Sequence, residues 1–320
     1  MKKIILLSLI SVLFANCSLF ADQEKANIKG ICIFEGQIKL YTNADWQALA
    51  DSHVTDFVII PKEAGKYGNS AEGYKANLSP LILNTVNQLV SRRSTAKIWI
   101  GTPGISSKNF EIAPSSLAPF VEFISDLRNQ IEAKVWKNNI RGIYMNQESV
   151  YGSVDYNDIM ANGTIKLMND LSSEVHKKFK KEFLWIPYYG YGSYSDEIIK
   201  KIGYVTNQKT IFDYVVIQPH YYFDKNVPQN LTGVHYCVSK QSICSTKGEI
   251  VIPKKSKTQV GAEMELSGKI VPPNNTPESL KLYNEYVASF TEFKGKSPII
   301  FYYDGNVQNA LSGRINPFFQ

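Results

Sequence analysis

The sequence predicts a single (β/α)8 barrel, an α/β fold in which eight parallel strands alternate with helices. Eight short apolar runs follow one another along nearly the whole chain, and most of the segments between them have a helical period. An open doubly wound sheet is disfavoured because no Gly-rich phosphate loop follows the first run. The 320 residues suffice for one large domain, and no second domain is evident.

The eight apolar runs are predicted to be buried strands. They are rich in Val, Ile and aromatic residues, and polar residues, Gly or Pro bound each of them. The runs span residues 28–35, 55–61, 96–103, 140–148, 182–190, 212–222, 258–266 and 297–305.

The segments between the runs carry helix signals. Ser79 and Thr276 each precede a proline, the pattern of a helix cap followed by the first helical position. Apolar residues recur with a helical period through residues 115–138. Residues 223–257 are the exception, because they are polar and irregular, and we expect a long loop there.

The first 21 residues have the form of a secretory signal peptide, with two lysines before an apolar run and Ala21 at the cleavage position. Residues 22–320 would then form the mature barrel domain of an exported protein, periplasmic or secreted. A lipid anchor at Cys17 remains an alternative. No later segment reaches the roughly 18 apolar residues of a membrane span, so we expect no transmembrane segment.

Cysteine usage agrees with export. Cys237 and Cys244 flank a short polar stretch, and in an oxidising compartment we predict a disulfide bond between them. Cys32 lies inside the first run and is expected to be buried. A metal site is the alternative for the cysteine pair, but no histidine stands at ligand spacing, and we expect no metal and no cofactor.

Charge points to no nucleic-acid partner. The formal net charge of +6 comes from short lysine clusters spread along the chain, and we interpret them as solvated faces. The sequence leaves the oligomeric state undetermined.

Acidic residues stand at strand ends, where a (β/α)8 barrel places its active site. Glu148 ends the fourth run, and Glu263 and Glu265 lie in the seventh. Two carboxylates across a barrel mouth are what glycoside hydrolysis requires, one to protonate the leaving oxygen and one to attack or to activate water. We favour Glu265 over Glu263 because it is nearer the rim, and the other choice remains open.

Further residues at strand ends are candidates for substrate binding. Asn146 shares a strand face with Glu148, because side chains alternate along a strand. The aromatic candidates are as consistent with core packing as with stacking on sugar rings. The full set is Glu35, Trp99, Asn146, Tyr188, Tyr189, Gln218, His220, Tyr222, Glu263 and Asp304.

Four segments carry a resemblance to a known family: "GIYMNQES", "FLWIPYYGYG", "FDYVVIQPHYYF" and "GAEMELSG". They resemble an uncharacterised family of glycoside-hydrolase-like barrels, domain of unknown function 4855. The resemblance is clear over the fourth to seventh strands and holds in outline in the N-terminal third. It implies a barrel with a carbohydrate-processing site, and it names no substrate.

A broader similarity is to retaining glycosidases that carry an acid/base glutamate on the fourth strand and a nucleophile glutamate on the seventh. Glu148 and Glu265 match these positions, although Gln147 stands where such enzymes commonly have asparagine. The sequence therefore predicts an exported, retaining glycoside hydrolase acting on an unidentified carbohydrate. A non-catalytic carbohydrate-binding barrel is the main alternative, and a deacetylase or a lyase is a third.

Overall fold

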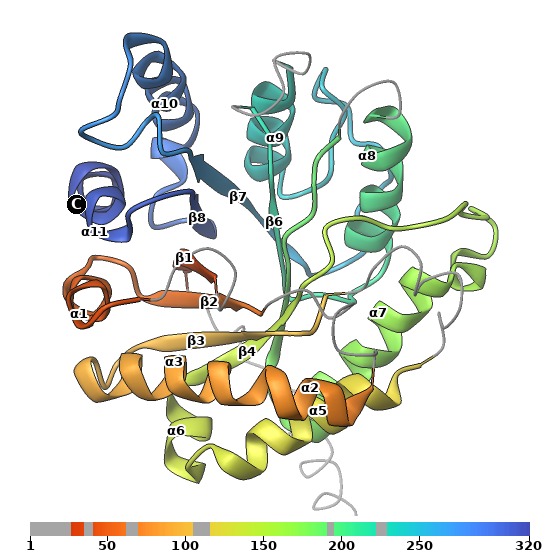
Figure 1. The fold of residues 1–320 in the computed structure, drawn as a ribbon. Coiled ribbons are helices and arrows are strands. Elements are labelled where there is room, and N and C mark those ends of the chain that lie inside the picture. Colours follow the sequence, from red (N-terminus) through yellow and green to blue (C-terminus); the bar gives the residue numbers. More distant parts are fainter. Residues whose placement is uncertain (1–26, 35–40, 62–69, 105–115, 191–194, 222–228) are drawn as a thin grey trace, which may run out of the picture.

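The fold is the predicted (β/α)8 barrel, as a computed structural model of the chain shows. The structure describes residues 27–34, 41–61, 70–104, 116–190, 195–221 and 229–320. Eight parallel strands close into a barrel in the order β1 to β8, and helices surround it (Figure 1). Within the described residues, no helix is long and apolar enough to cross a membrane.

The strands are short and lie within the predicted apolar runs. They are β1 Lys29–Phe34, β2 Asp56–Ile60, β3 Lys97–Gly101, β4 Ile140–Met145, β5 Glu182–Trp185, β6 Tyr214–Ile217, β7 Gln259–Leu266 and β8 Ile299–Tyr303. Three of them, β4, β5 and β6, end several residues before the corresponding run does. The residues that follow these strands therefore form the rim of the barrel and are not part of the sheet.

The helices pack their apolar sides on the outer face of the strands, where most of the buried hydrophobic residues lie. They are α1 Asn43–Asp51, α2 Ala71–Asn77, α3 Ser79–Arg92, α5 Ala118–Gln130, α6 Ala133–Asn138, α7 Gly163–Glu174, α8 Ser195–Gly203, α9 Gln229–Lys240, α10 Pro277–Phe290, α11 Val307–Ala310 and α12 Asn316–Phe319. Short 3-10 or π turns are η2 Ile159–Ala161, η3 Val175–Phe179, η5 Tyr204–Gln208, η6 Thr291–Phe293 and η7 Leu311–Ile315.

Two predicted helix starts have different outcomes. Thr276 caps α10 as predicted, since its hydroxyl accepts the N–H of Ser279 at 3.2 Å. Ser79 does not cap α3, because the helix begins at Ser79 itself and its hydroxyl donates to Asp126 at 2.9 Å. That hydroxyl links α3 to α5 and leaves the start of α3 without a side-chain cap.

The prediction of a loop over residues 223–257 is wrong for Gln229–Lys240, which form α9, and is confirmed for residues 241–257, which form no helix or strand. Leu231, Val234 and Val238 are buried against the core at helical spacing. Polar residues and Gly233 interrupt this apolar face and hide its period in the sequence. The glycine is required because an added Cβ would lie 2.4 Å from the hydroxyl oxygen of Tyr189.

Cys237 and Cys244 are neighbours, one in α9 and one shortly after it. The structure describes both as buried free thiols, so it does not contain the predicted disulfide. The sulfur of Cys237 accepts the N–H of Cys244 at 3.1 Å. Burial raises the pKa of the Cys237 thiol, whereas the side-chain hydrogen bond between the two lowers the pKa of Cys244. The two side chains are therefore already in contact.

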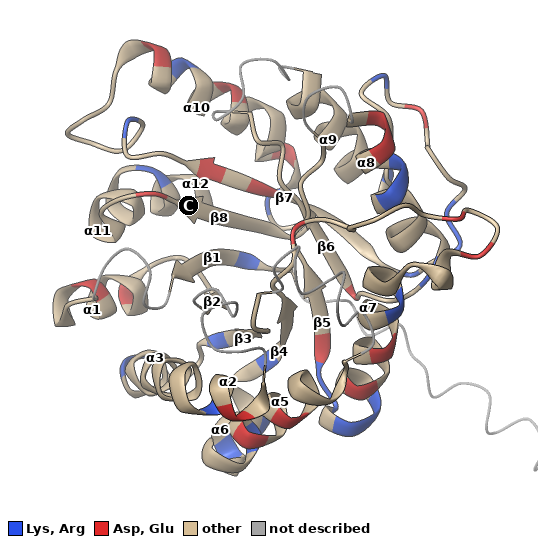
Figure 2. Ribbon diagram, turned by 45° about the vertical axis from the view of Figure 1, so that its right-hand side comes forward, with Lys and Arg blue, Asp and Glu red and all other residues tan. Residues whose placement is uncertain are grey.

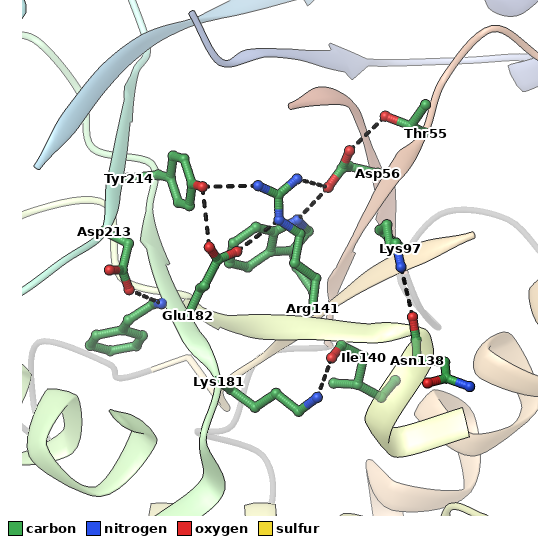
Figure 3. Close-up of polar contacts among 12 residues, drawn as sticks. Thr55, Asp56, Lys97, Asn138, Ile140, Arg141, Lys181, Glu182, Asp213 and Tyr214 are labelled. Atoms are coloured by element: carbon green, nitrogen blue, oxygen red, sulfur yellow. Dashed lines mark hydrogen bonds and ion pairs between the residues drawn. The ribbon is translucent and has the colours of Figure 1, made fainter. Parts of the chain in front are cut away.

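The floor of the barrel is closed by a charged network around Arg141 (Figure 3). The guanidinium pairs with Asp56 on β2 and Glu182 on β5, each at 2.8 Å, and donates to the hydroxyl of Tyr214 on β6 at 2.9 Å. The indole of Trp99 on β3 donates to Asp56 at 3.1 Å and lies 5.2 Å from the guanidinium. Burial opposes the charge of Arg141, but its carboxylate neighbours hold its pKa above the ordinary value.

We predict that Arg141→Met destabilises the fold, because it leaves the carboxylate of Asp56, 1% exposed, without its cationic partner. The expected loss in the free energy of unfolding is about 3 kcal/mol, near the low end for a broken buried pair. Glu182 contributes less to this loss, since its side chain is 38% exposed. Urea denaturation followed by circular dichroism measures the difference.

The matched control is Lys75→Met, which breaks the pair between Lys75 and Glu122. Its members are 36% and 54% exposed and lie 3.8 Å apart, so the expected change is below about 0.5 kcal/mol. Equal effects of the two substitutions would contradict the structural role assigned to Arg141.

Candidate active site

Glu148 lies on the rim of the barrel, three residues beyond β4. Its carboxylate accepts hydrogen bonds from the side chains of Tyr188 and Gln218, the latter at 3.3 Å to Oε1. Its backbone carbonyl accepts the N–H of Tyr188 at 3.1 Å, which joins the end of β4 to the end of β5. Glu148 is therefore positioned through both its main chain and its side chain.

The pKa of Glu148 is raised above its ordinary value, chiefly because burial disfavours the charged form. The negative charge of Glu265 raises it further. The hydrogen bonds from Tyr188 and Gln218 and the charge of His220 act in the opposite direction. The net effect favours a protonated Glu148 at a higher pH than a solvated glutamate allows.

Glu265 lies in β7, and its side chain is only 2% exposed. Its Oε2 accepts the N–H of Tyr221 at 3.2 Å and the hydroxyl of Tyr286. Its Oε1 lies 3.5 Å from Nδ1 of His220. These neighbours come from the rim after β6 and from α10, so Glu265 is held at the mouth end of its strand.

Glu263 lies one inward-facing position deeper on the same strand. It is 3% exposed, and the thiol of Cys32 on β1 donates to its Oε1 at 3.7 Å. Burial raises its pKa well above the ordinary value, and the charges of Glu265 and Glu148 raise it further. The surroundings of Glu263 therefore favour its neutral form inside the barrel, whereas Glu265 lies nearer the rim. Figure 2 shows the acidic positions of β7 in red.

His220 lies between the two rim carboxylates. Its ring meets that of Tyr188 edge to face, with centroids 5.0 Å apart, and Nδ1 is near Glu265. The backbone of His220 is left-handed, with φ of 55°, an unusual conformation for a residue with a side chain. Such non-glycine outliers concentrate at functional sites.

Gln218 joins the ends of β5 and β6 at the rim. Its backbone N–H donates to the carbonyl of Pro187 at 2.9 Å, and its carbonyl accepts the N–H of Tyr189 at 3.0 Å. Its side-chain amide donates to Ile186 at 3.0 Å as well as to Glu148. A series of neighbouring side chains thus runs from Glu148, after β4, through Gln218 and His220, after β6, to Glu265 in β7.

The remaining predicted site residues that the structure describes have no contact with Glu148 or Glu265 among the hydrogen bonds and ion pairs given above. Asn146 is at the rim and donates to the carbonyl of Pro61 at 3.4 Å. Asp304 follows β8 and is exposed. Tyr189 is fully buried and packs on Gly233 of α9, and its hydroxyl donates to the carbonyl of Cys244, just beyond that helix, at 2.6 Å. Trp99 belongs to the floor and does not reach the mouth.

Trp99 and Tyr189 are therefore not placed as predicted. Trp99 lies midway along β3 and points inward, so the barrel buries it. Tyr189 alternates with Tyr188 and turns toward the helix layer. Glu35 and Tyr222 lie outside the described residues.

Several residues near the carboxylates were not predicted as site residues. Cys32, Tyr144 and Tyr302 point into the barrel, and the electrostatic influence of Glu263 raises the pKa of each after the larger effect of burial. Strand alternation could have indicated all three. Tyr286 could not be found in this way, because α10 lies outside the barrel and nothing in its sequence points to the mouth.

Three carboxyl groups thus share the mouth end of a closed barrel. In the part of the chain that the structure describes, no group of three His, Cys, Asp or Glu side chains could hold a metal ion. One carboxyl has a pKa raised by burial, and another accepts two hydrogen bonds. Carboxyl groups in such different surroundings are what acid/base chemistry at a barrel mouth would require.

The chain belongs to the family called domain of unknown function (DUF4855), whose model matches residues 116–310, more than half of the sequence. This confirms the resemblance found in the sequence. Among curated proteins, no sequence matches this chain significantly.

Solved structures with this fold include glycoside-hydrolase barrels. A glycoside hydrolase family 5 enzyme from Prevotella bryantii has a TM-score of 0.52 at 10% identity, covering 91% of this chain and 94% of that one. A GH18 chitinase from Pseudoalteromonas aurantia has a TM-score of 0.50 at 11% identity, covering 90% and 97%. A chitinase-like agglutinin from Robinia pseudoacacia has a TM-score of 0.51 at 10% identity, covering 92% and 100%. At these identities the similarity is one of fold.

We predict that Glu263→Gln stabilises the protein increasingly as pH rises. The folded protein keeps this proton to a higher pH than the unfolded chain, in which glutamate ionises near 4.5. The unfolded state therefore binds fewer protons above that pH, and wild-type stability declines as pH rises toward the folded pKa. Glutamine has no proton to lose, so the variant escapes this decline.

Urea denaturation at pH 4 and at pH 8 measures the effect, with the two proteins similar at the lower pH. Glu249→Gln, at an exposed position, is the control and should follow wild type at both. If the free energy of unfolding of Glu263→Gln changes with pH as that of the wild type does, Glu263 is not a buried neutral acid.

Proposed function

We propose that this protein is an exported retaining glycoside hydrolase in which Glu148 is the general acid/base and Glu265 the nucleophile. The observation that carries the proposal is the difference between two carboxyl groups at one barrel mouth. Burial raises the pKa of Glu148, which favours a proton donor. Glu265 accepts two hydrogen bonds on one oxygen, which favours an oriented carboxylate.

The reaction has two steps. In the first, a Glu265 oxygen bonds to the anomeric carbon while the glycosidic bond breaks, and the leaving oxygen takes the proton of Glu148. In the second, the ionised Glu148 takes a proton from water, and this water attacks the anomeric carbon and releases Glu265. Two inversions at the same carbon retain its configuration.

The electrostatics of the site favour this change of role by Glu148. The negative charge of Glu265 helps to raise the pKa of Glu148 before the reaction. That charge disappears when Glu265 becomes an ester, so the pKa of Glu148 falls. The residue thus keeps its proton until the first step and is ionised for the second, as the mechanism requires.

The fold comparisons support the class of function. Two of the solved structures that share the fold are a family 5 glycoside hydrolase and a chitinase. The agglutinin in the same group motivates the alternative, a carbohydrate-binding barrel without turnover. Export is supported by the signal-like first 21 residues, which lie outside the described part of the chain.

We predict that Glu265→Ala abolishes glycosidase turnover and that Glu148→Ala lowers kcat by about 10²- to 10⁴-fold on substrates with poor leaving groups. Substrates are first found by screening the mature protein against glycans and aryl glycosides. The activity of the wild type should fall as pH rises through the raised pKa of Glu148, because the acid then loses its proton.

Azide distinguishes the two roles. With Glu148→Ala, azide attacks the glycosyl ester and gives a glycosyl azide of retained configuration. With Glu265→Ala, azide replaces the nucleophile and gives the inverted product. Glu263→Gln is the matched control and should keep turnover. Loss of activity in Glu263→Gln but not in Glu265→Ala would move the nucleophile to Glu263, and glycan binding without any turnover would support the carbohydrate-binding alternative.

We also predict that Cys237 and Cys244 form a disulfide in the exported protein. The two buried thiols interact through a side-chain hydrogen bond, and an oxidising compartment supplies a protein disulfide that accepts their two electrons by thiol exchange. Mass spectrometry of protein purified without reductant, after blocking of free thiols, should show neither cysteine alkylated. Alkylation of both would refute the prediction, and Cys32, also buried, serves as the free-thiol reference after denaturation.

A further inference from the structure

The two oxygens of Glu265 have different surroundings. Oε2 accepts two hydrogen bonds, from the N–H of Tyr221 and the hydroxyl of Tyr286. Oε1 accepts no hydrogen bond from the described residues and lies 3.5 Å from Nδ1 of His220. A carboxylate attacks a carbon through one of its two oxygens, so the different surroundings of Oε1 and Oε2 bear on which oxygen attacks.

Tyr286 comes from a helix outside the barrel. It is fully buried in α10, and its ring contacts those of Tyr221 and Phe290, with centroids 5.8 and 6.1 Å away. These contacts restrict the ring to one orientation, in which the hydroxyl meets Glu265. The donor is thus placed by packing and does not need to be ordered when substrate binds.

Tyr221 is anchored to the same helix. Its hydroxyl donates to the carboxylate of Glu285, the residue before Tyr286 in α10. Its N–H, besides reaching Glu265, lies 3.4 Å from the hydroxyl of Tyr286. The left-handed turn at His220 directs this N–H toward β7. Helix α10 therefore controls both donors to Oε2, one directly and one through Glu285.

We propose that Tyr286 is a positioning residue that holds Oε2 of Glu265 and so makes Oε1 the attacking oxygen, and that Glu285 supports it by anchoring Tyr221. This inference rests on the proposed function, in which Glu265 is the nucleophile. It concerns residues of the outer helix layer, which the two-carboxylate mechanism does not itself require.

The arrangement serves both steps of the reaction. When Oε1 bonds to the anomeric carbon, Oε2 becomes the carbonyl oxygen of the ester and keeps its two donors. When water then displaces the ester, negative charge returns to the carboxylate and the same donors stabilise it. No further reactant is needed, since Tyr286 gives up no proton in either step.

The first test needs no substrate. Glutamate labelled with ¹³C at Cδ gives a resonance for Glu265, identified as the one lost in Glu265→Gln. Tyr286→Phe removes only the hydroxyl and should shift this resonance. Tyr283→Phe is the matched control, because Tyr283 is on the same helix and its hydroxyl donates to Arg314 at 3.0 Å, away from the carboxylates. An unshifted resonance in folded Tyr286→Phe overturns the proposal.

The second test uses an aryl glycoside that the wild type hydrolyses. Tyr286→Phe should lower kcat about 10- to 100-fold, the effect of one hydrogen bond to a charged group, with little change in ligand Kd. The loss should be equal for good and poor leaving groups, because it lies in the nucleophile. A loss confined to poor leaving groups, or a loss equally large in Tyr283→Phe, overturns the proposal.

Tyr221→Phe provides a second variant if Tyr286→Phe does not fold, since Tyr221 is only partly buried. It removes the anchor to Glu285 and keeps the backbone N–H, and it should shift the Glu265 resonance and lower kcat with unchanged Kd. No change in either measurement overturns the role of Glu285. A shifted resonance in a protein that hydrolyses no glycoside would retain the positioning role and refute the proposed function.

Discussion

The structure depends on one buried guanidinium. Arg141, from β4, bonds to acceptors on β2, β5 and β6, and β3 joins through the indole of Trp99. Five consecutive strands are thereby tied at their N-terminal ends. Gly142 has no side chain because an added Cβ would lie 2.2 Å from the Trp99 ring, so even the residue after Arg141 is dictated by this network. The charges at the floor are thus paired with one another, and the acidic residues with raised pKa values described above lie at the opposite end of the barrel.

The mouth has the opposite electrostatic character. At the floor, Asp56 and Glu182 face a buried cation. At the mouth, Glu148 and Glu263 lie near other carboxyl groups, uncharged donors and a partly exposed histidine, with no lysine or arginine among the described neighbours that affect their pKa values. Burial without a strong cation raises the pKa of a carboxyl group, and burial beside one stabilises its charge. The same fold therefore pairs its acidic residues with a cation at one end and raises the pKa of two of them at the other.

The outer helices take part in the site as well as in stability. Helix α9 fixes the end of β5, since Asn230 donates to the carbonyl of Gly190 at 2.6 Å and Tyr189 packs on Gly233. Helix α10 supplies the hydroxyl that reaches Glu265. Because these helices follow β6 and β7 and pack over them, the rim residues between strand and helix are held from both sides. The rim residues are thus oriented by helices that lie outside the barrel.

By itself, the sequence determined the barrel, the order of its strands and the position of Glu148 and Glu265 at the mouth. These follow from local patterns, because apolar runs mark the strands and the ends of parallel strands meet at one face. Tertiary structure decided the rest. Trp99 and Tyr189 are aromatic residues like the rim candidates. Trp99 points into the barrel and Tyr189 points out toward the helices, and these directions depend on strand register. Helix α9 could not be predicted, because Gly233 interrupts its apolar pattern, and the reason for that glycine is its contact with Tyr189, which belongs to another segment. Tyr286 reaches Glu265 across the layer between helix and sheet, a contact between a helix residue and a strand-end residue that no spacing in the sequence encodes.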